Sequence, residues 1–116
     1  MKVSIQQALM RLPAAPTATY PDGAPFVTMM AGGSMSVEVF APRGRDRQLP
    51  HAQDELYFVH RGTAGLVIGG QRFDCAPGDA FFVAAGVEHH FEDFSDDFVT
   101  WVVFYGPEGG ERQGPG

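Results

Sequence analysis

The feature that most constrains the fold of this chain is the close spacing of its turn signals. Between Phe26 and Tyr105, glycine or proline interrupts a series of short runs rich in apolar and β-branched residues, and such runs are typical of strands. The 15 glycines and 9 prolines make up more than a fifth of the 116 residues, a composition that fits many short strands better than a helical bundle. We therefore expect an all-β protein, either a sandwich or a small jelly-roll barrel.

The expected elements fall into three parts. Residues 1–25 hold one short helix, capped by Ser4 and stopped by Pro13, and a connector. Residues 26–106 form the barrel, and residues 107–116 form a flexible tail. The expected strands are 26–31, 34–41, 55–60, 63–68, 71–76, 80–85, 87–94 and 97–106. The clearest hairpin is VIGGQRF, because the pair Gly69-Gly70 suits a two-residue turn.

Charge and cysteine usage exclude several classes of function. The chain has 14 acidic and 8 basic residues and a net charge of −6, so it lacks the basic surface that nucleic acid or an anionic membrane requires. No apolar run is long enough to span a bilayer. Cys75 is alone, and residues 1–13 lack the features of a signal peptide. We expect a cytoplasmic protein with no nucleic-acid or membrane partner.

Two histidines lie at the edges of expected strands beside acidic residues. These are His51 and His89, and imidazole with carboxylate is the usual ligand set for Zn, Fe, Mn or Ni. His89 and His90 face opposite sides of a strand, so only one of them can point inward. His51 and Glu55 would lie roughly 13 Å apart on a continuous strand. A shared site therefore requires the strand to break between them.

The segment GDAFFVAAGVEHHFED, residues 78–93, resembles the second motif of the cupins, G-x5-P-x-G-x2-H-x3-N. Gly78, Gly86 and His89 match, whereas Ala84 replaces the proline and Asp93 replaces the asparagine. A resemblance to the first cupin motif precedes this segment in the chain, and together the two cover about residues 40–105.

The segment HAQDELYFVHRG resembles the end of the first cupin motif, H-x-H-x(3 or 4)-E-x6-G. One alignment makes His51 the second histidine and puts Leu49 in the place of the first. The other puts His51 first and Gln53 second, but it needs a shortened loop. We favour the first alignment because it needs no deletion.

The resemblance implies an RmlC-like jelly-roll barrel (a double-stranded β-helix) that binds a divalent metal through His51, Glu55 and His89. Fe, Mn, Zn and Ni all suit this set. The family's remaining histidine is missing, and Gln53 or water could take its place. A polar rim or a hydrogen-bond network without metal is the alternative for these residues.

Four further side chains are candidates for the lining of a substrate pocket. Tyr57, Phe91 and Trp101 could line the cavity, although core packing is the simpler explanation for each of them taken alone. Glu38 could supply an extra base if its face of the strand points inward.

The resemblance leaves several functions open. The first is a metal-dependent enzyme of the dioxygenase or isomerase type that acts on a small organic substrate. The second is a non-catalytic module that binds a sugar-like or apolar ligand. The third is a metal-free cupin that serves only dimerisation. Homodimers are common among cupins, so the resemblance also implies a homodimer.

Overall fold

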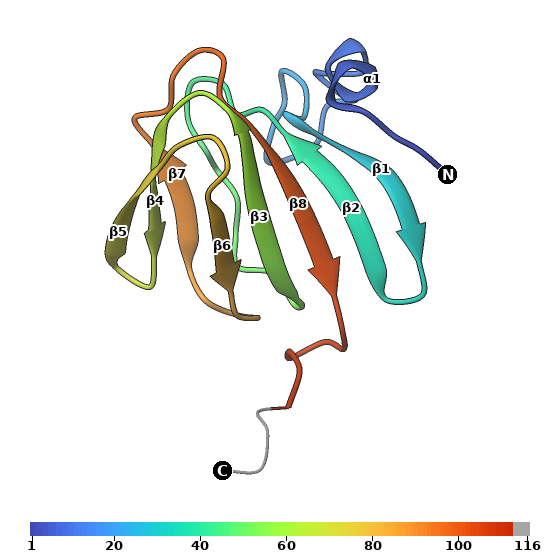
Figure 1. Ribbon diagram of the computed structural model, residues 1–116, viewed down its shortest axis with the longest axis vertical. Coiled ribbons are helices and arrows are strands. Elements are labelled where there is room, and N and C mark those ends of the chain that lie inside the picture. The colour runs from blue at the N-terminus through green and yellow to red at the C-terminus, as the bar shows by residue number, and fades with distance from the viewer. Residues whose placement is uncertain (113–116) are drawn as a thin grey trace.

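The computed structural model describes residues 1–112, and its strands form two antiparallel sheets that close into a barrel (Figure 1). One sheet has the strand order β1-β2-β8-β3-β6 and the other has the order β5-β4-β7. The elements are α1 (Ile5–Met10), β1 (Phe26–Gly32), β2 (Met35–Phe40), β3 (Asp54–Arg61), β4 (Ala64–Ile68), β5 (Gln71–Cys75), β6 (Ala80–Val83), β7 (His89–Glu92) and β8 (Val99–Tyr105). The prediction of an all-β jelly-roll barrel with one short N-terminal helix is confirmed.

The turn between β4 and β5 shows why the glycine pair predicts a hairpin. Gly69 and Gly70 have φ values of 55° and 87°, and the flanking residues Ile68 and Gln71 pair across the strands. Two consecutive positive φ values define a type I′ turn, whose twist matches that of the strands.

Aromatic and aliphatic side chains from both sheets fill the barrel. Phe91 of β7 lies 4.9 Å from Tyr57 of β3 and 5.0 Å from Phe98, measured between ring centroids. Leu66 of β4 is fully buried in the same cluster. Each such side chain stabilises the fold by about 1.5–3 kcal/mol on burial. This core fixes the strands from which the candidate site is built.

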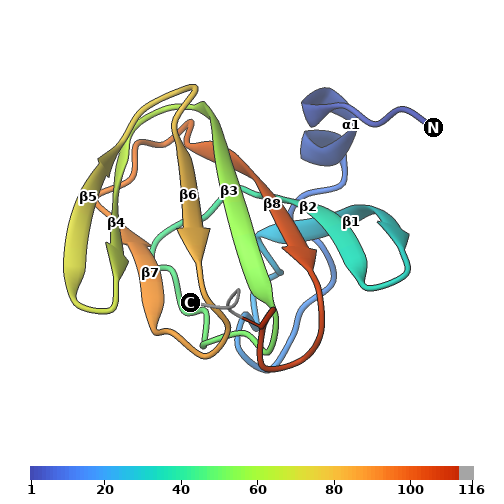
Figure 2. The ribbon, with the colours of Figure 1, turned by 60° about the horizontal axis from the view of Figure 1, so that its bottom comes forward.

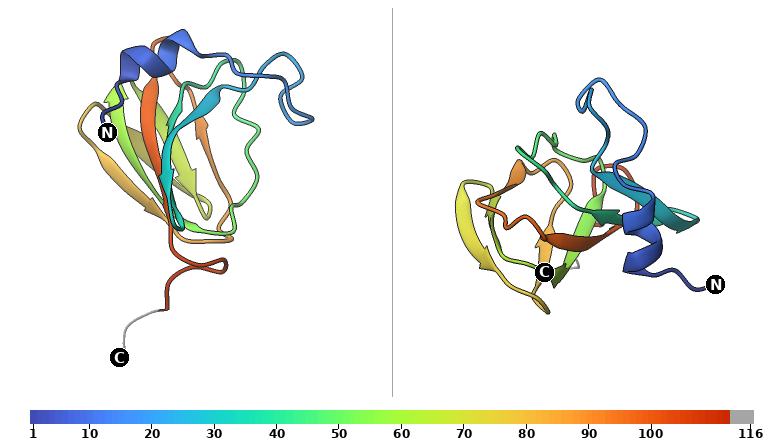
Figure 3. Two further views of the ribbon diagram at one scale, coloured as in Figure 1. Left: turned by 90° about the vertical axis from the view of Figure 1, so that its right-hand side faces the viewer. Right: turned by 90° about the horizontal axis from the view of Figure 1, so that it is seen from above.

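Helix α1 covers part of the outer face of the larger sheet (Figure 3). Ser4 and Gln7 form a capping box, in which each side chain accepts a hydrogen bond from the other residue's backbone N–H. The helix has six residues, and no helix in residues 1–112 is long and apolar enough to cross a membrane. Its buried residues form an outer cluster with strand residues: Ile5, Ala8, Val27, Val39 and Val99.

Trp101 belongs to this outer cluster, so the prediction that it lines the barrel interior is wrong. Side chains alternate along β8, so Val102 and Phe104 face the interior and Trp101 faces outward. Both faces of β8 are covered, one by the other sheet and one by α1. Periodicity alone therefore could not tell which face holds the cavity.

A long loop joins β2 to β3, and the start of the tail packs on it (Figure 2). Residues 41–53 form this loop, so His51 lies in a loop rather than at a strand end as predicted. Within the predicted flexible tail, Gly109 N donates to Ala52 O at 2.7 Å and Glu111 N donates to Asp54 Oδ2 at 2.8 Å. The first part of the tail is thus tied to the loop, and residues 113–116 lie outside the described part.

Candidate metal centre

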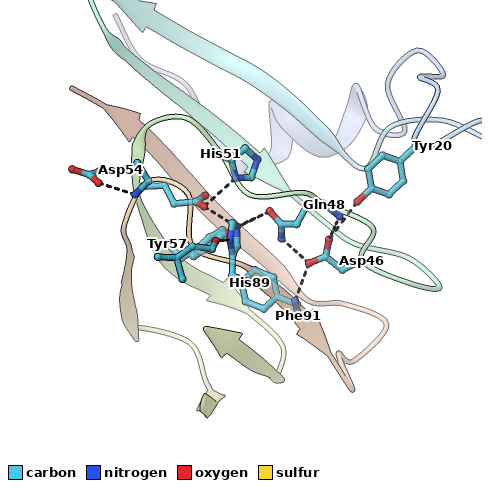
Figure 4. Close-up of polar contacts among 11 residues, drawn as sticks. Tyr20, Asp46, Gln48, His51, Asp54, Tyr57, His89 and Phe91 are labelled. Atoms are coloured by element: carbon cyan, nitrogen blue, oxygen red, sulfur yellow. Dashed lines mark hydrogen bonds and ion pairs between the residues drawn. The ribbon is translucent and has the colours of Figure 1, made fainter. Parts of the chain in front are cut away.

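Three side chains from three different segments meet inside the barrel (Figure 4). Glu55 comes from β3, His89 from β7 and His51 from the 41–53 loop. Glu55 Oε1 lies 3.2 Å from His51 Nδ1 and 2.7 Å from His89 Nε2. One ligand atom from each residue lies within 4.8 Å of the others. The structure therefore brings together the three residues for which the resemblance implies metal binding.

Glu55 is the buried centre of the group. It is 1% exposed, and its Oε2 atom has no hydrogen-bond partner among residues 1–112. Burial raises the pKa of Glu55, but hydrogen bonds from His51 and His89 outweigh burial and hold it below its ordinary value. A buried carboxylate oxygen without a partner is costly, and a cation would satisfy it. This observation shows that the donor set fits a metal ion.

The backbone orients the ring of His89. Its Nδ1 atom lies 2.9 Å from Val87 O, and a carbonyl oxygen only accepts, so Nδ1 carries a hydrogen. The other nitrogen, Nε2, then faces Glu55 and holds either a proton or a metal. Burial lowers the pKa of His89, but the hydrogen bond and charge of Glu55 outweigh it and raise the pKa. His90 faces outward and is exposed, in agreement with the strand alternation.

Backbone contacts place His51 opposite these two residues. Its carbonyl oxygen accepts a hydrogen bond from Gly86 N at 2.8 Å, and Gly86 has a φ of 78°. This left-handed conformation explains why the second motif needs glycine at that position. The His51 ring lies 4.8 Å from the ring of Phe104 and 5.2 Å from that of His89. On a continuous strand His51 and Glu55 would lie roughly 13 Å apart. The structure avoids this separation because His51 lies in the loop before β3.

Gln53 lies elsewhere, so the prediction that it could take the place of the missing histidine is wrong. Its Nε2 atom donates to Ser34 O at 2.8 Å and to Gly106 O at 2.9 Å, so the amide ties the β1–β2 turn to the end of β8. Gln48 is the amide at the site instead, with Oε1 3.0 Å from His89 Nε2. Sequence reasoning missed Gln48 because loop residues carry no periodic pattern.

A cavity of about 270 Å³ adjoins the three candidate ligands. Glu38 and Tyr57 line this cavity, whereas Phe91 packs in the core against the Tyr57 ring. Burial is the main cause of the raised pKa of Glu38, and burial with the charge of Glu55 raises the pKa of Tyr57 well above its ordinary value. Tyr20, from the connector that sequence reasoning left without a role, also lines the cavity. The remaining lining residues are Phe26, Phe40, Gln48, His51, Glu55, Val102 and Phe104.

The protein is thus a small β-barrel domain built from two sheets. Two histidines and a carboxylate converge inside it and form a candidate metal centre. The chain belongs to the cupin family, because residues 36–105 match the Cupin domain family model, Cupin_2. It is 40% identical over 89 residues to an uncharacterised protein of Streptomyces coelicolor, a match that covers 75% of this chain and 84% of that protein.

Solved structures show the same fold. The plu4264 protein of Photorhabdus luminescens matches with a TM-score of 0.60 and 18% identity, over 70% of this chain and 73% of that one. KdgF from Halomonas matches with a TM-score of 0.61 and 17% identity, over 68% and 74%. A cupin 2 conserved barrel domain protein from Salinispora arenicola matches with a TM-score of 0.58 and 22% identity, over 70% and 74%. These likenesses concern the fold alone.

Proposed function

We propose that the protein binds one divalent metal ion through His51, Glu55 and His89 and that the bound ion serves a small organic molecule in the adjoining cavity. The observation that carries this proposal is the buried Glu55, whose Oε1 atom contacts both imidazoles and whose Oε2 atom has no hydrogen-bond partner among residues 1–112. When bound, such a metal supplies Lewis acidity or oxygen activation. Fe, Mn, Zn and Ni all accept nitrogen and carboxylate ligands.

The cavity lining favours a mostly apolar ligand. Its aromatic walls include Tyr20, Phe40 and Phe104, and two carboxylates, Glu38 and Glu55, also face it. None of the described lining residues is a lysine or arginine, so the bound metal ion would be the cation that attracts an anionic oxygen of the ligand, and the protein lining adds no second anion site. At about 270 Å³ the cavity is smaller than the pockets that hold drug-sized ligands. A phenol- or enol-like molecule meets these conditions.

Glu38 and Tyr57 are the cavity groups that could handle protons. The raised pKa of Glu38 brings the carboxylate closer to the range in which it can accept and return a proton near neutral pH. The Tyr57 hydroxyl stays protonated and can donate a hydrogen bond. These groups support an isomerase-like proton transfer, and the same cavity also suits a dioxygenase.

A second candidate is a metal-free binding module. His51 and His89 both contact Glu55 Oε1, so a protonated His89 can pair with the carboxylate without any ion. Under this alternative the cavity binds its ligand through aromatic contacts and catalyses nothing.

Metal content separates the two candidates. The protein is purified without a chelator or a histidine tag, and its bound metals are measured by elemental analysis. We expect near-stoichiometric metal in the wild type, loss of metal in His89→Ala and Glu55→Gln, and retention in His90→Ala, the outward-facing control on the same strand. A wild type that takes up none of added Fe, Mn, Zn or Ni would overturn the proposal and favour the binding module.

Activity is tested on the metal-loaded protein. Oxygen consumption with catechols and β-diketones tests for a dioxygenase, and proton exchange of β-diketones in heavy water tests for an isomerase-like reaction. We expect Glu38→Gln to reduce the exchange without loss of metal. Binding of these compounds with neither reaction would identify a non-catalytic metal-containing module.

We also propose that the protein is a homodimer. Phe58 of β3 is 43% exposed and Phe82 of β6 is 49% exposed. Leu56 pairs with Phe82, so Leu56, Phe58 and Phe82 share the outer face of the larger sheet. Helix α1 packs on other strands of this sheet, and an apolar face of this kind supports association with a second copy.

A further inference from the structure

The side-chain amide of Gln48 lies at the candidate metal centre, where its oxygen faces His89 Nε2 and the Tyr57 hydroxyl. Gln48 Oε1 is 3.0 Å from His89 Nε2 and 3.2 Å from the Tyr57 hydroxyl (Figure 4). Gln48 also lines the cavity together with His51 and Glu55. The segment that carries it, residues 42–50, looks in the sequence like an ordinary polar loop.

Asp46 fixes which end of the amide points at the site. Gln48 Nε2 donates to Asp46 Oδ2 at 2.6 Å, and Gln48 N donates to Asp46 Oδ1 at 3.1 Å. An ionised carboxylate only accepts hydrogen bonds, so the amide nitrogen must face Asp46 and the oxygen must face His89. Asp46 is itself 7% exposed and is held by Phe91 N at 2.8 Å and by the Tyr20 hydroxyl at 3.3 Å.

When His89 is neutral, as metal binding requires, three hydrogen-bond acceptors converge at one place. Because Nδ1 of His89 donates to Val87 O, the neutral ring presents a lone pair at Nε2. Gln48 Oε1 lies 3.0 Å from that atom and Glu55 Oε1 lies 2.7 Å from it. Lone pairs so close repel one another unless a proton or a cation lies between them.

We propose that Gln48 Oε1 is the fourth protein ligand of the metal and that Asp46 is the positioning residue that aims it. The inference rests on the proposed metal site at His51, Glu55 and His89. Gln48 takes the place that the missing histidine of the family leaves, and it offers a neutral oxygen instead of a nitrogen. The charged hydrogen bond that Gln48 Nε2 donates to Asp46 polarises the amide and strengthens its oxygen as a ligand for the metal.

Cobalt(II) is the probe that tests this proposal, because its visible spectrum reports the ligands and the coordination number. Purified metal-free protein is titrated with Co²⁺ by calorimetry and by absorption. We expect Gln48→Leu to lower Co²⁺ affinity by about 10- to 100-fold and to change the visible bands. Asp46→Asn should lower the affinity as well, because an amide at residue 46 no longer holds the Gln48 amide in a single orientation. Gln53→Ala is the matched control, since its amide faces away, and it should bind like the wild type.

Gln48→His replaces the proposed oxygen ligand with a nitrogen ligand. It should restore tight Co²⁺ binding with visible bands shifted from those of the wild type, because a nitrogen replaces an oxygen. Circular dichroism and thermal melting verify folding, and this variant keeps the test decisive if Gln48→Leu does not fold.

The outcomes separate this proposal from the proposed metal site. If His89→Ala abolishes Co²⁺ binding while Gln48→Leu and Gln48→His both match the wild type in affinity and spectrum, Gln48 is not a ligand and the three-residue site stands. If the folded wild type binds no Co²⁺ at all, the metal site itself fails and the role of Gln48 fails with it.

Discussion

At the scale of single residues, the chemistry of the candidate site depends on Glu55. Its carboxylate is buried, one oxygen contacts both histidines, and the other oxygen has no partner in the described part of the chain. The two sequence motifs predict Glu55, His51 and His89 because their spacings place ligands on a barrel. They do not predict Gln48, whose position depends on the path of a loop and on its hydrogen bond to Asp46.

Metal binding should weaken as the pH falls through the raised pKa of His89. Protons and metal compete for Nε2, because Nδ1 is engaged with Val87 O. Thermal melting with and without Zn²⁺ at pH 5.5 and pH 8 measures this competition. We expect the Zn²⁺-induced increase in melting temperature to be larger at pH 8, and an equal increase at both pH values would contradict the assignment of His89.

The metal-free protein should depend on pH in the opposite sense near neutrality. The pKa of His89 is raised above 6.5, so its contribution to stability is full below 6.5 and is lost as the pH rises through the folded-state pKa. The pKa of Glu55 is lowered from 4.5, so its contribution is present above 4.5 and is lost as the pH falls through the folded-state pKa. When a chelator keeps the protein metal-free, the His89–Glu55 pair therefore stabilises the fold most between pH 4.5 and 6.5.

At the scale of elements, Asp54 ties the β6–β7 connection and the tail to the strand that carries Glu55. Its side chain accepts hydrogen bonds from Ala85 N at 2.9 Å and Glu111 N at 2.8 Å, which join the end of β6 and the tail to the start of β3. These two bonds lower the pKa of Asp54. Because Asp54 precedes Glu55, the same contacts help to fix the position of the central ligand.

Loss of the Asp54 side chain should destabilise the fold. Asp54→Ala leaves the backbone N–H groups of Ala85 and Glu111 without their acceptor, so we expect a lower free energy of unfolding. Urea denaturation followed by fluorescence measures the free energy of unfolding, and Asp22→Ala, at an exposed position in the connector, is the control. Equal unfolding midpoints for Asp54→Ala and the control would show that the tail contact contributes nothing.

Cys75 at the end of β5 should be inert to thiol reagents in the folded protein. It is 2% exposed, and burial together with the charge of Asp79 raises its pKa to about 11. Because the thiolate is the reactive form, we expect negligible reaction with Ellman's reagent at pH 8 and full reaction in guanidinium chloride. Rapid reaction of the native protein would mean that β5 opens readily.

The strands could be predicted from the sequence far better than the loops. Alternating residues and the pair Gly69-Gly70 locate β4 and β5, since strand geometry is local. The residues that fix the site from loops, Tyr20 and Gln48, act through contacts 26 and 41 positions along the chain. The sequence also could not show which face of β8 points into the barrel, because α1 covers the opposite face, which holds Trp101.

At the scale of the whole molecule, the barrel leaves part of its larger sheet uncovered. The proposed homodimer should form through the face of Phe58 and Phe82. Light scattering after size-exclusion chromatography should give the mass of two chains for the wild type and of one chain for Phe82→Asp, since a buried unpaired charge opposes the contact. A monomeric wild type would contradict this interface, and so would a dimeric Phe82→Asp.

The central claim is that one metal ion lies between His51, Glu55 and His89. An anomalous-difference map from crystals grown with Zn²⁺, recorded on both sides of the zinc absorption edge, tests it directly. The account predicts one strong peak about 2.0–2.2 Å from a nitrogen of each histidine and from a Glu55 oxygen. A map with no peak there, in crystals where His89 and Glu55 remain hydrogen-bonded to each other, would contradict it.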